Sequence, residues 1–137
     1  MRQRTKYKLM IALERVNNRL TRAALRRGWA PRFYALLETT GRRSGMPRHT
    51  PVGAGMRPGD AVFWLIAPHG RRADYVRNIE RDPRVRVRVR GVWHAGVAQI
   101  LPDDDTDARS RILPYQWDAA IGRLMASDPL TIRIDLS

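Results

Sequence analysis

The sequence predicts a mainly β domain with peripheral helices (α+β), built as a small barrel of about six strands. Two observations predict this class. Short segments rich in branched and aromatic residues recur from residue 33 to the end of the chain, and glycines and prolines separate them. Helical patterns are too few to alternate with these strands, which argues against a doubly wound parallel sheet. The 137 residues fit a single domain.

A basic amphipathic helix is expected over residues 1–30, ahead of a barrel domain over 31–137. Residues 1–27 hold nine basic residues against one acid, and their apolar residues recur at helical spacing: Leu9, Leu13, Val16 and Leu20. Gly28 and Pro31 end the pattern. Two interpretations stay open. The helix lies on the barrel with a solvated basic face, or it contacts an anionic membrane surface.

Six strands are predicted from branched and aromatic runs or from alternation, over residues 33–39, 49–52, 61–67, 84–90, 93–101 and 130–136. Residues 41–45 form a glycine-bracketed turn, and residues 53–60, with Pro58, predict a hairpin loop. Trp64 and Trp93 are expected in the core. Four arginines alternate with valines and are expected on a solvated strand face, the alternative being a polyanion-binding stripe: Arg84, Arg86, Arg88 and Arg90.

Helices are expected over residues 71–81, 103–112 and 117–126. Asp82 and Pro83 stop the first of them. Three consecutive aspartates open the second, where negative side chains complement the helix dipole.

Several classes of function are excluded by what the sequence lacks. There is no cysteine, and the three histidines show no metal-ligand spacing, so we expect no metal site. No nucleophile elbow, Walker loop or dinucleotide-binding fingerprint is present. His49 and His94 are interpreted as structural. Redox chemistry in such a chain must come from a bound organic cofactor.

The net charge of +13 points to an anionic partner. All but two of the 26 basic residues are arginines, which suit bidentate capture of phosphate and carboxylate. The partner is a nucleic acid, an anionic membrane or a polyanionic small molecule. No apolar run is long enough to span a bilayer, and no secretory leader is evident. We therefore expect a cytoplasmic protein, with membrane association through the first helix left open.

Residues 39–48 read T-T-G-R-R-S-G-M-P-R and gather two glycines, three arginines and several hydroxyls. This composition suits a phosphate or carboxylate, although an ordinary basic hairpin fits it as well. The segment resembles the T-T-G-R-K/R-S/T-G-x-P-R signature of the deazaflavin-dependent nitroreductase family. Three further blocks resemble that family in order: A-P-H-G at 67–70, N-I-E-R-D-P-R-V-R-V at 78–87 and D-P-L-T-I-R-I at 128–134.

The resemblance implies a split β-barrel related to the flavin-mononucleotide-binding oxidoreductases. It implies coenzyme F-420 as cofactor, with flavin mononucleotide (FMN) as the alternative, and a hydride that comes from the cofactor rather than from a catalytic side chain. The cofactor-binding residues that it implies are Gly41, Arg42, Arg43, Ser44, Gly45, Arg48, Thr50, Pro51, Ala67, Pro68, His69, Gly70 and Asn78. Tyr75, Tyr115 and Trp117 are candidates for the substrate pocket, and for the last two the packing of a helix against the barrel is an equal alternative.

Within that set, the arginines and Ser44 would hold the phosphodiester and polyglutamate tail of F-420, and residues 67–70 would line the deazaflavin ring. Two residues depart from the family. Pro68 stands where many members have serine, and His69 where they have lysine. The stretch 122–125 also lacks the tyrosines of nitro-reducing members. The cofactor assignment is unaffected, but a nitro acceptor does not follow.

The sequence therefore leaves three functions open. The first is an F-420H2-dependent oxidoreductase that transfers a hydride to a small electrophile, such as a quinone, enone or nitro compound. The second is a non-catalytic carrier of flavin, deazaflavin or lipid with the same fold. The third, a nucleic-acid-binding protein, is favoured only by the charge and by the arginine strand, because the sequence lacks the usual recognition motifs.

Overall fold

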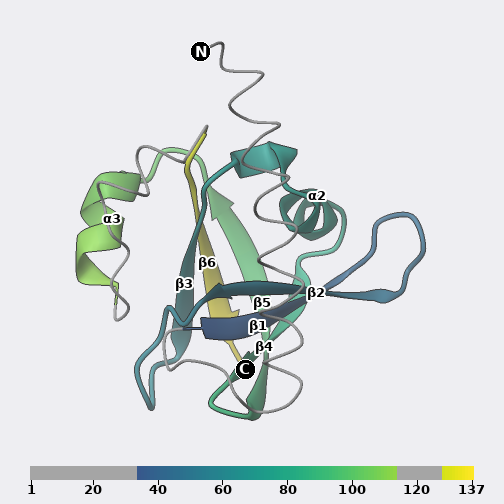
Figure 1. Cartoon of the computed structure of the whole chain (residues 1–137), viewed down its shortest axis with the longest axis horizontal. Helices are drawn as coiled ribbons and strands as arrows, with labels where there is room; N and C mark the ends of the chain where they lie inside the picture. Colours follow the sequence, from purple (N-terminus) through teal and green to yellow (C-terminus); the bar gives the residue numbers. More distant parts are fainter. Residues whose placement is uncertain (1–33, 114–127) are drawn as a thin grey trace.

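The computed structural model describes residues 34–113 and 128–137 (Figure 1). The elements in chain order are β1 Tyr34–Thr40, β2 Pro47–Gly53, β3 Val62–Ala67, the 3-10 helix η1 Gly70–Arg72, α2 Asp74–Arg81, β4 Arg84–Val89, β5 Val92–Leu101, α3 Thr106–Ile112 and β6 Leu130–Leu136. The predicted helices over 1–30 and 117–126 lie outside the described residues.

The six strands form one curled antiparallel sheet in the order β2-β1-β4-β5-β6-β3. In Figure 1, β1 and β2 run across β3, β5 and β6, so the sheet bends back on itself as a half-barrel. β2 and β3 are its edge strands. The predicted mainly β class with about six strands is confirmed.

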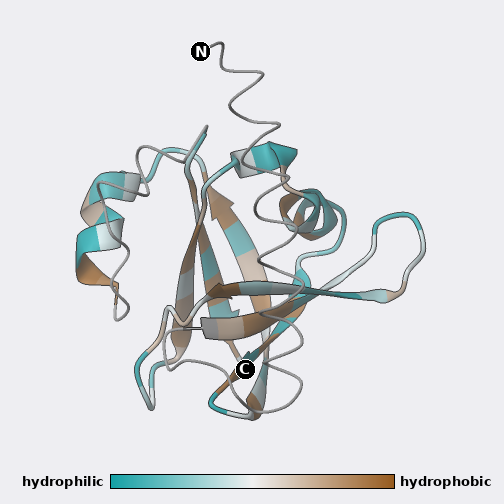
Figure 2. Ribbon diagram, viewed as in Figure 1, coloured by the Kyte–Doolittle hydropathy of each residue, from teal (hydrophilic) through white to brown (hydrophobic). Residues whose placement is uncertain are grey.

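The concave face of the sheet carries the core. Alternation along β4 places Val85, Val87 and Val89 inside and its arginines outside, and Figure 2 shows the corresponding change between hydrophobic and hydrophilic colours along the strands. Phe63 and Leu65 of β3 and Ile132 and Ile134 of β6 are almost fully buried in the same cluster. This apolar face is the main stabilising feature of the described domain.

Two connections differ from their predictions. The segment 53–60 is not a hairpin loop, because β2 and β3 lie at opposite edges of the sheet and do not pair. The helix predicted over 71–81 is broken at Ala73, whose extended backbone (φ −72°, ψ 137°) separates η1 from α2. Local helical periodicity continues through this bend and does not reveal it.

The prediction that Trp64 and Trp93 lie in the core is wrong. Each is partly buried on the convex face of the sheet, and Phe63 and Leu65 on either side of Trp64 face the core instead. The Arg109 guanidinium lies 3.8 Å from the ring centroid of Trp64, and that of Arg86 lies 4.5 Å from that of Trp93. Cation–π contacts therefore cover both rings.

The helix α3 begins later than the predicted residue 103, because the Asp105 carboxylate caps it by accepting a hydrogen bond from the backbone N–H of Ala108 (3.1 Å). Among the residues that the structure describes, none of the helices has the length and hydrophobicity of a membrane span. In the same residues no group of side chains could hold a metal ion.

Candidate cofactor-binding site

The turn between β1 and β2 is tightly closed by its glycines. The Gly41 N–H donates to the carbonyl of Met46, and the Gly45 N–H donates to the carbonyl of Gly41, both at 2.8 Å. Gly45 has a φ of +70°, which favours glycine, and a Cβ added at Gly41 would come within 2.7 Å of the Ser44 hydroxyl. Both glycines are therefore needed for this compact turn.

Asn78 of α2 holds the β1–β2 turn in place through side-chain hydrogen bonds. Its side-chain oxygen accepts hydrogen bonds from the backbone N–H of Arg42 (3.1 Å) and from the Arg42 guanidinium (3.0 Å). Its amide nitrogen donates to the Thr39 hydroxyl (3.2 Å). Asn78 and Thr39 are 3% and 2% exposed, so the bond between them is shielded from water, whereas the two bonds from Arg42 are part-buried. These hydrogen bonds thus join α2 to parts of the chain that lie 36 to 39 positions earlier in the sequence.

A pocket of about 450 Å³ opens where this turn meets β2 and α2, and it is lined by Gly41, Arg42, Arg43, Ser44, Arg48, His49, Thr50, Pro51, Asp74 and Asn78. Because β2 is an edge strand, one side of its backbone is not paired within the sheet. The pocket therefore combines backbone groups, hydroxyls and guanidinium groups.

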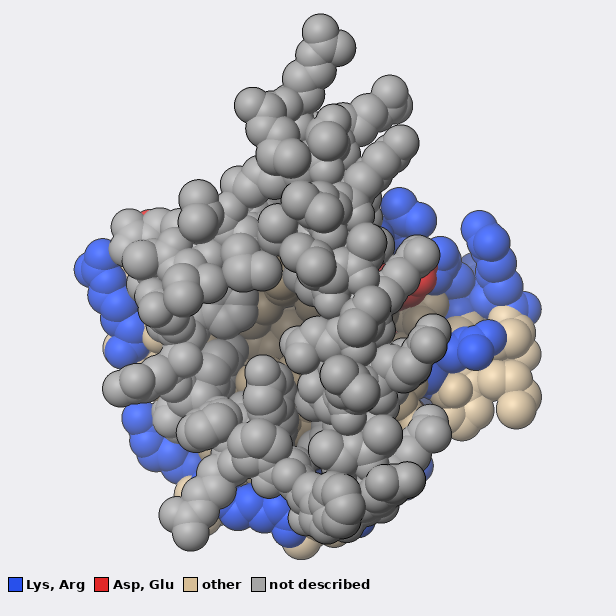
Figure 3. All heavy atoms as spheres, viewed as in Figure 1, with Lys and Arg blue, Asp and Glu red and all other residues tan. Residues whose placement is uncertain are grey.

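The pocket is electropositive. Arg42 is partly satisfied by Asn78 and by the Asp74 carboxylate, which lies 3.2 Å from its guanidinium. Arg48 reaches the Ser44 hydroxyl at 3.4 Å, and Arg43 is exposed and has no hydrogen bond or ion pair with the described residues. Figure 3 shows basic side chains gathered at this edge of the molecule, over the β1–β2 turn and α2. Such a donor set is suited to phosphate or carboxylate groups.

His49 is tied to a charged cluster on the convex face. Its Nε2 lies 2.9 Å from Oε2 of Glu38, and both Glu38 oxygens accept hydrogen bonds from Arg86 at 2.8 Å. The Arg86 guanidinium, and secondarily His49, hold the pKa of Glu38 below its ordinary 4.5, against the opposing effect of burial. This cluster fixes the position of β2 beside the pocket.

The arginine strand does not form a free polyanion-binding stripe. Arg86 is paired with Glu38, and Arg84 is paired with Asp82 at 3.0 Å. The hydrogen bonds from Arg84 also hold the pKa of Asp82 below its ordinary value. Two of the four arginines are thus neutralised by neighbouring carboxylates, which favours the interpretation of β4 as a solvated strand face.

Most of the predicted cofactor-binding residues come together in the pocket, and Gly45 lies in the same turn. Ala67, Pro68, His69 and Gly70 do not line it, and three of these four are buried at the end of β3. There the Asp128 N–H donates to the Pro68 carbonyl (3.1 Å), and Gly70, with φ +54°, packs against Asp128.

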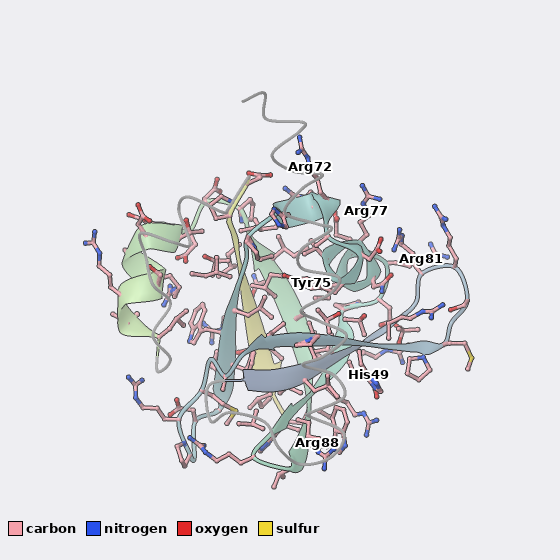
Figure 4. All side chains as sticks on the ribbon, viewed as in Figure 1. His49, Arg72, Tyr75, Arg77, Arg81 and Arg88 are labelled. Carbon is pink, nitrogen blue, oxygen red and sulfur yellow. The ribbon has the colours of Figure 1, made fainter. Side chains whose placement is uncertain are left out.

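Of the candidate substrate residues, Tyr75 alone lies among those that the structure describes, and it does not line this pocket. Tyr75, in the first turn of α2, is partly buried against the core, whereas Arg72, Arg77 and Arg81 point outward from η1 and α2 (Figure 4). Tyr115 and Trp117 lie outside the described residues. These three remain predictions.

Sequence reasoning missed two residues of the pocket, Asp74 and His49. Asp74 lies one helical turn before Asn78, so a signal was present in the i, i+4 spacing once Asn78 was chosen. His49 was interpreted as structural, and its contact with Glu38 agrees with that interpretation, but the residue also lines the pocket.

Comparison with solved structures confirms the fold. A protein of unknown function, Atu2129, from Agrobacterium tumefaciens str. C58 is 22% identical with a TM-score of 0.60 over 75% of this chain, which spans only 47% of that protein. A general stress protein 26-related member of the pyridoxinephosphate oxidase family from Clostridium acetobutylicum is 15% identical (TM-score 0.56; 76% of this chain, 75% of the other). An F-420H2-dependent reductase, FDR-A, is 18% identical (TM-score 0.52; 75% and 94%).

Comparison with curated proteins found no match. The model of one protein family, described as F-420H2-dependent quinone reductase, matches residues 14–137. The resemblance to deazaflavin-dependent enzymes is thus confirmed, although the matched family is named for quinones rather than for nitro compounds. The chain belongs to the F-420H2-dependent quinone reductase family, whose members are enzymes that use coenzyme F-420.

Proposed function

We propose that the chain binds reduced coenzyme F-420 in the pocket beside the β1–β2 turn and reduces a small electrophile, with a quinone as the first candidate. The observation that carries this proposal is the convergence of Arg42, Arg43 and Arg48 on one pocket, in a member of an F-420-dependent family. Enones and nitro compounds are further candidate acceptors.

The residues of the pocket fit the anionic tail of the cofactor. A phosphodiester and carboxylates require cationic and hydrogen-bond donors, and Arg43 and Arg48 are exposed at the pocket with the hydroxyls of Ser44 and Thr50 nearby. The N–H groups of Gly41 and Gly45 are used within the turn, so the donors offered to the tail are chiefly these side chains. FMN carries one phosphate and no polyglutamate, so it would use fewer of these donors.

The bound cofactor supplies the hydride, and the acceptor gains this hydride and a proton, so that a quinone becomes a quinol. The chain itself contributes positioning and electrostatics. Asn78 holds the arginine-bearing turn in place. The contact between Glu38 and His49 holds β2 beside the pocket. The resemblance places the ring near residues 67–70, whose backbone is fixed by the hydrogen bond between Asp128 and Pro68.

Steady-state reduction of menadione by F-420H2 tests this proposal. The wild-type protein should turn over, and Arg43→Ala should raise the KM for F-420H2 by about tenfold, because a charge-assisted hydrogen bond is lost. Arg111→Ala is the matched control, since Arg111 is an exposed arginine of α3 outside the pocket. Tight F-420 binding without turnover of any quinone, enone or nitro compound would instead support the carrier function.

A further inference from the structure

Among the described residues that line the electropositive pocket, one carries a carboxylate: Asp74, in the first turn of α2. Its Oδ1 accepts a hydrogen bond from Nη2 of Arg42 at 3.2 Å. A carboxylate in this position is unexpected, because it repels the phosphate and carboxylates that the surrounding arginines would attract.

Arg42 has two different partners. Asn78 holds the inner end of Arg42, through its backbone N–H and Nη1, and this contact is part-buried. Asp74 holds the outer end, and its side chain is 82% exposed whereas that of Arg42 is 24% exposed. Asp74 can therefore turn into solvent without uncovering the core, and the loss of such an exposed ion pair costs little. The turn stays anchored by Asn78 when Asp74 leaves.

We propose that Asp74 lowers the affinity of the pocket for the anionic tail of its cofactor, by occupying the outer end of Arg42 and by opposing negative charge. This inference rests on the proposed function. In this arrangement Arg43 and Arg48 make the first contacts with the tail, and Arg42 joins them only after the tail displaces Asp74. The displacement makes cofactor release easier, because the Asp74 carboxylate competes for Arg42 as the tail leaves.

The effect depends on the charge of the ligand. A ligand with phosphate and several carboxylates is opposed by Asp74 at more than one group, whereas a deazaflavin without its tail is hardly affected. Removing the charge of Asp74 should therefore tighten binding of the whole cofactor selectively. The gain should decrease with rising ionic strength, because the pocket is open to solvent and its charges are screened.

Titration of the full chain with F-420, followed by cofactor fluorescence, tests the proposal. Asp74→Asn should lower the Kd for F-420 by about threefold to tenfold, as expected for one partly screened charge. It should change the Kd of a deazaflavin lacking phosphate and glutamates by less than about twofold. The dissociation rate of F-420 should fall by a similar factor.

Asp135→Asn is the matched control. It removes one exposed carboxylate from an Arg–Asp pair on β6, where Asp135 and Arg133 lie 3.0 Å apart and outside the pocket. Both variants change the net charge equally, so an equal gain in both would overturn the proposal, as would unchanged or weaker F-420 binding by Asp74→Asn. If the wild-type protein itself does not bind F-420, the proposed function fails instead.

Discussion

Asn78→Ala should destabilise both the domain and the pocket, because Asn78 links α2 to the arginine-bearing turn. The substitution removes three hydrogen bonds, two from Arg42 and one to Thr39. A neutral hydrogen bond contributes about 1 kcal/mol and one to a charged group about 1.5–3 kcal/mol. Arg42 can regain water, but the Thr39 hydroxyl, at 2% exposure, cannot.

We therefore expect Asn78→Ala to lower the free energy of unfolding by about 2–4 kcal/mol, or roughly 10 °C in Tm for a domain of this size. F-420 binding should weaken by about tenfold, since the turn must then be ordered at the expense of binding energy. Urea unfolding and fluorescence titration measure the two effects.

Thr39→Val separates stability from binding. It breaks only the hydrogen bond between Asn78 and Thr39, and it leaves both contacts with Arg42 in place. It should cost about 1–2 kcal/mol in unfolding free energy and should change F-420 affinity less than threefold or so. Two results would contradict the anchoring role of Asn78. One is a loss of less than about 1 kcal/mol in the free energy of unfolding of Asn78→Ala, and the other is an equal weakening of F-420 binding in the two variants.

Three other predictions concern separate parts of the chain. Gly70→Ala should cost at least about 2 kcal/mol in urea unfolding, because the residue has φ +54° and its new Cβ would lie 2.6 Å from the Asp128 carbonyl oxygen; an unchanged midpoint would refute the close packing. Glu38 has a pKa below its ordinary 4.5, chiefly through Arg86 and then His49, so its stabilising contribution is present above pH 4.5 and is lost as the pH falls through the lowered value. Glu38→Gln should thus be less stable than wild type at pH 7, with a difference that narrows under acid in thermal melts; a constant difference would contradict the linkage. Arg43→Ala should weaken binding of whole F-420 by about tenfold and leave a deazaflavin without phosphate and glutamates almost unaffected; equal losses for both ligands would show that Arg43 does not hold the tail.

The strands were predictable because each depends on a local pattern. The alternation of arginine and valine along β4 predicted both the strand and its buried face, and β6 Leu130–Leu136 has the predicted bounds. The error on Trp64 arose from ranking residue type above alternation, since Phe63 and Leu65 on either side of it face the core. The position of β2 and β3 at opposite edges could not be predicted from the loop that joins them, because strand order depends on long-range pairing.

The residues of the site were likewise predictable where they are contiguous in sequence, but not where long-range packing brings them together. The glycines, arginines and Ser44 of the pocket are contiguous in sequence, so composition and resemblance both pointed to them. Asp74 joins them only because α2 packs against the end of β1, and Asn78, which the resemblance did suggest, acquires its role through Thr39 and Arg42. A sequence read alone contains no information on which arginine is already paired with a carboxylate.

The role proposed for the pocket beside the β1–β2 turn is to bind coenzyme F-420 by its tail. Parallel fluorescence titrations of the wild-type chain and Arg43→Ala with F-420 and with FMN test it most directly. Micromolar or tighter binding of F-420, weaker binding of FMN and a selective loss of F-420 affinity in Arg43→Ala are the predicted results. Preference for FMN, or F-420 binding that is indifferent to Arg43, would contradict this role.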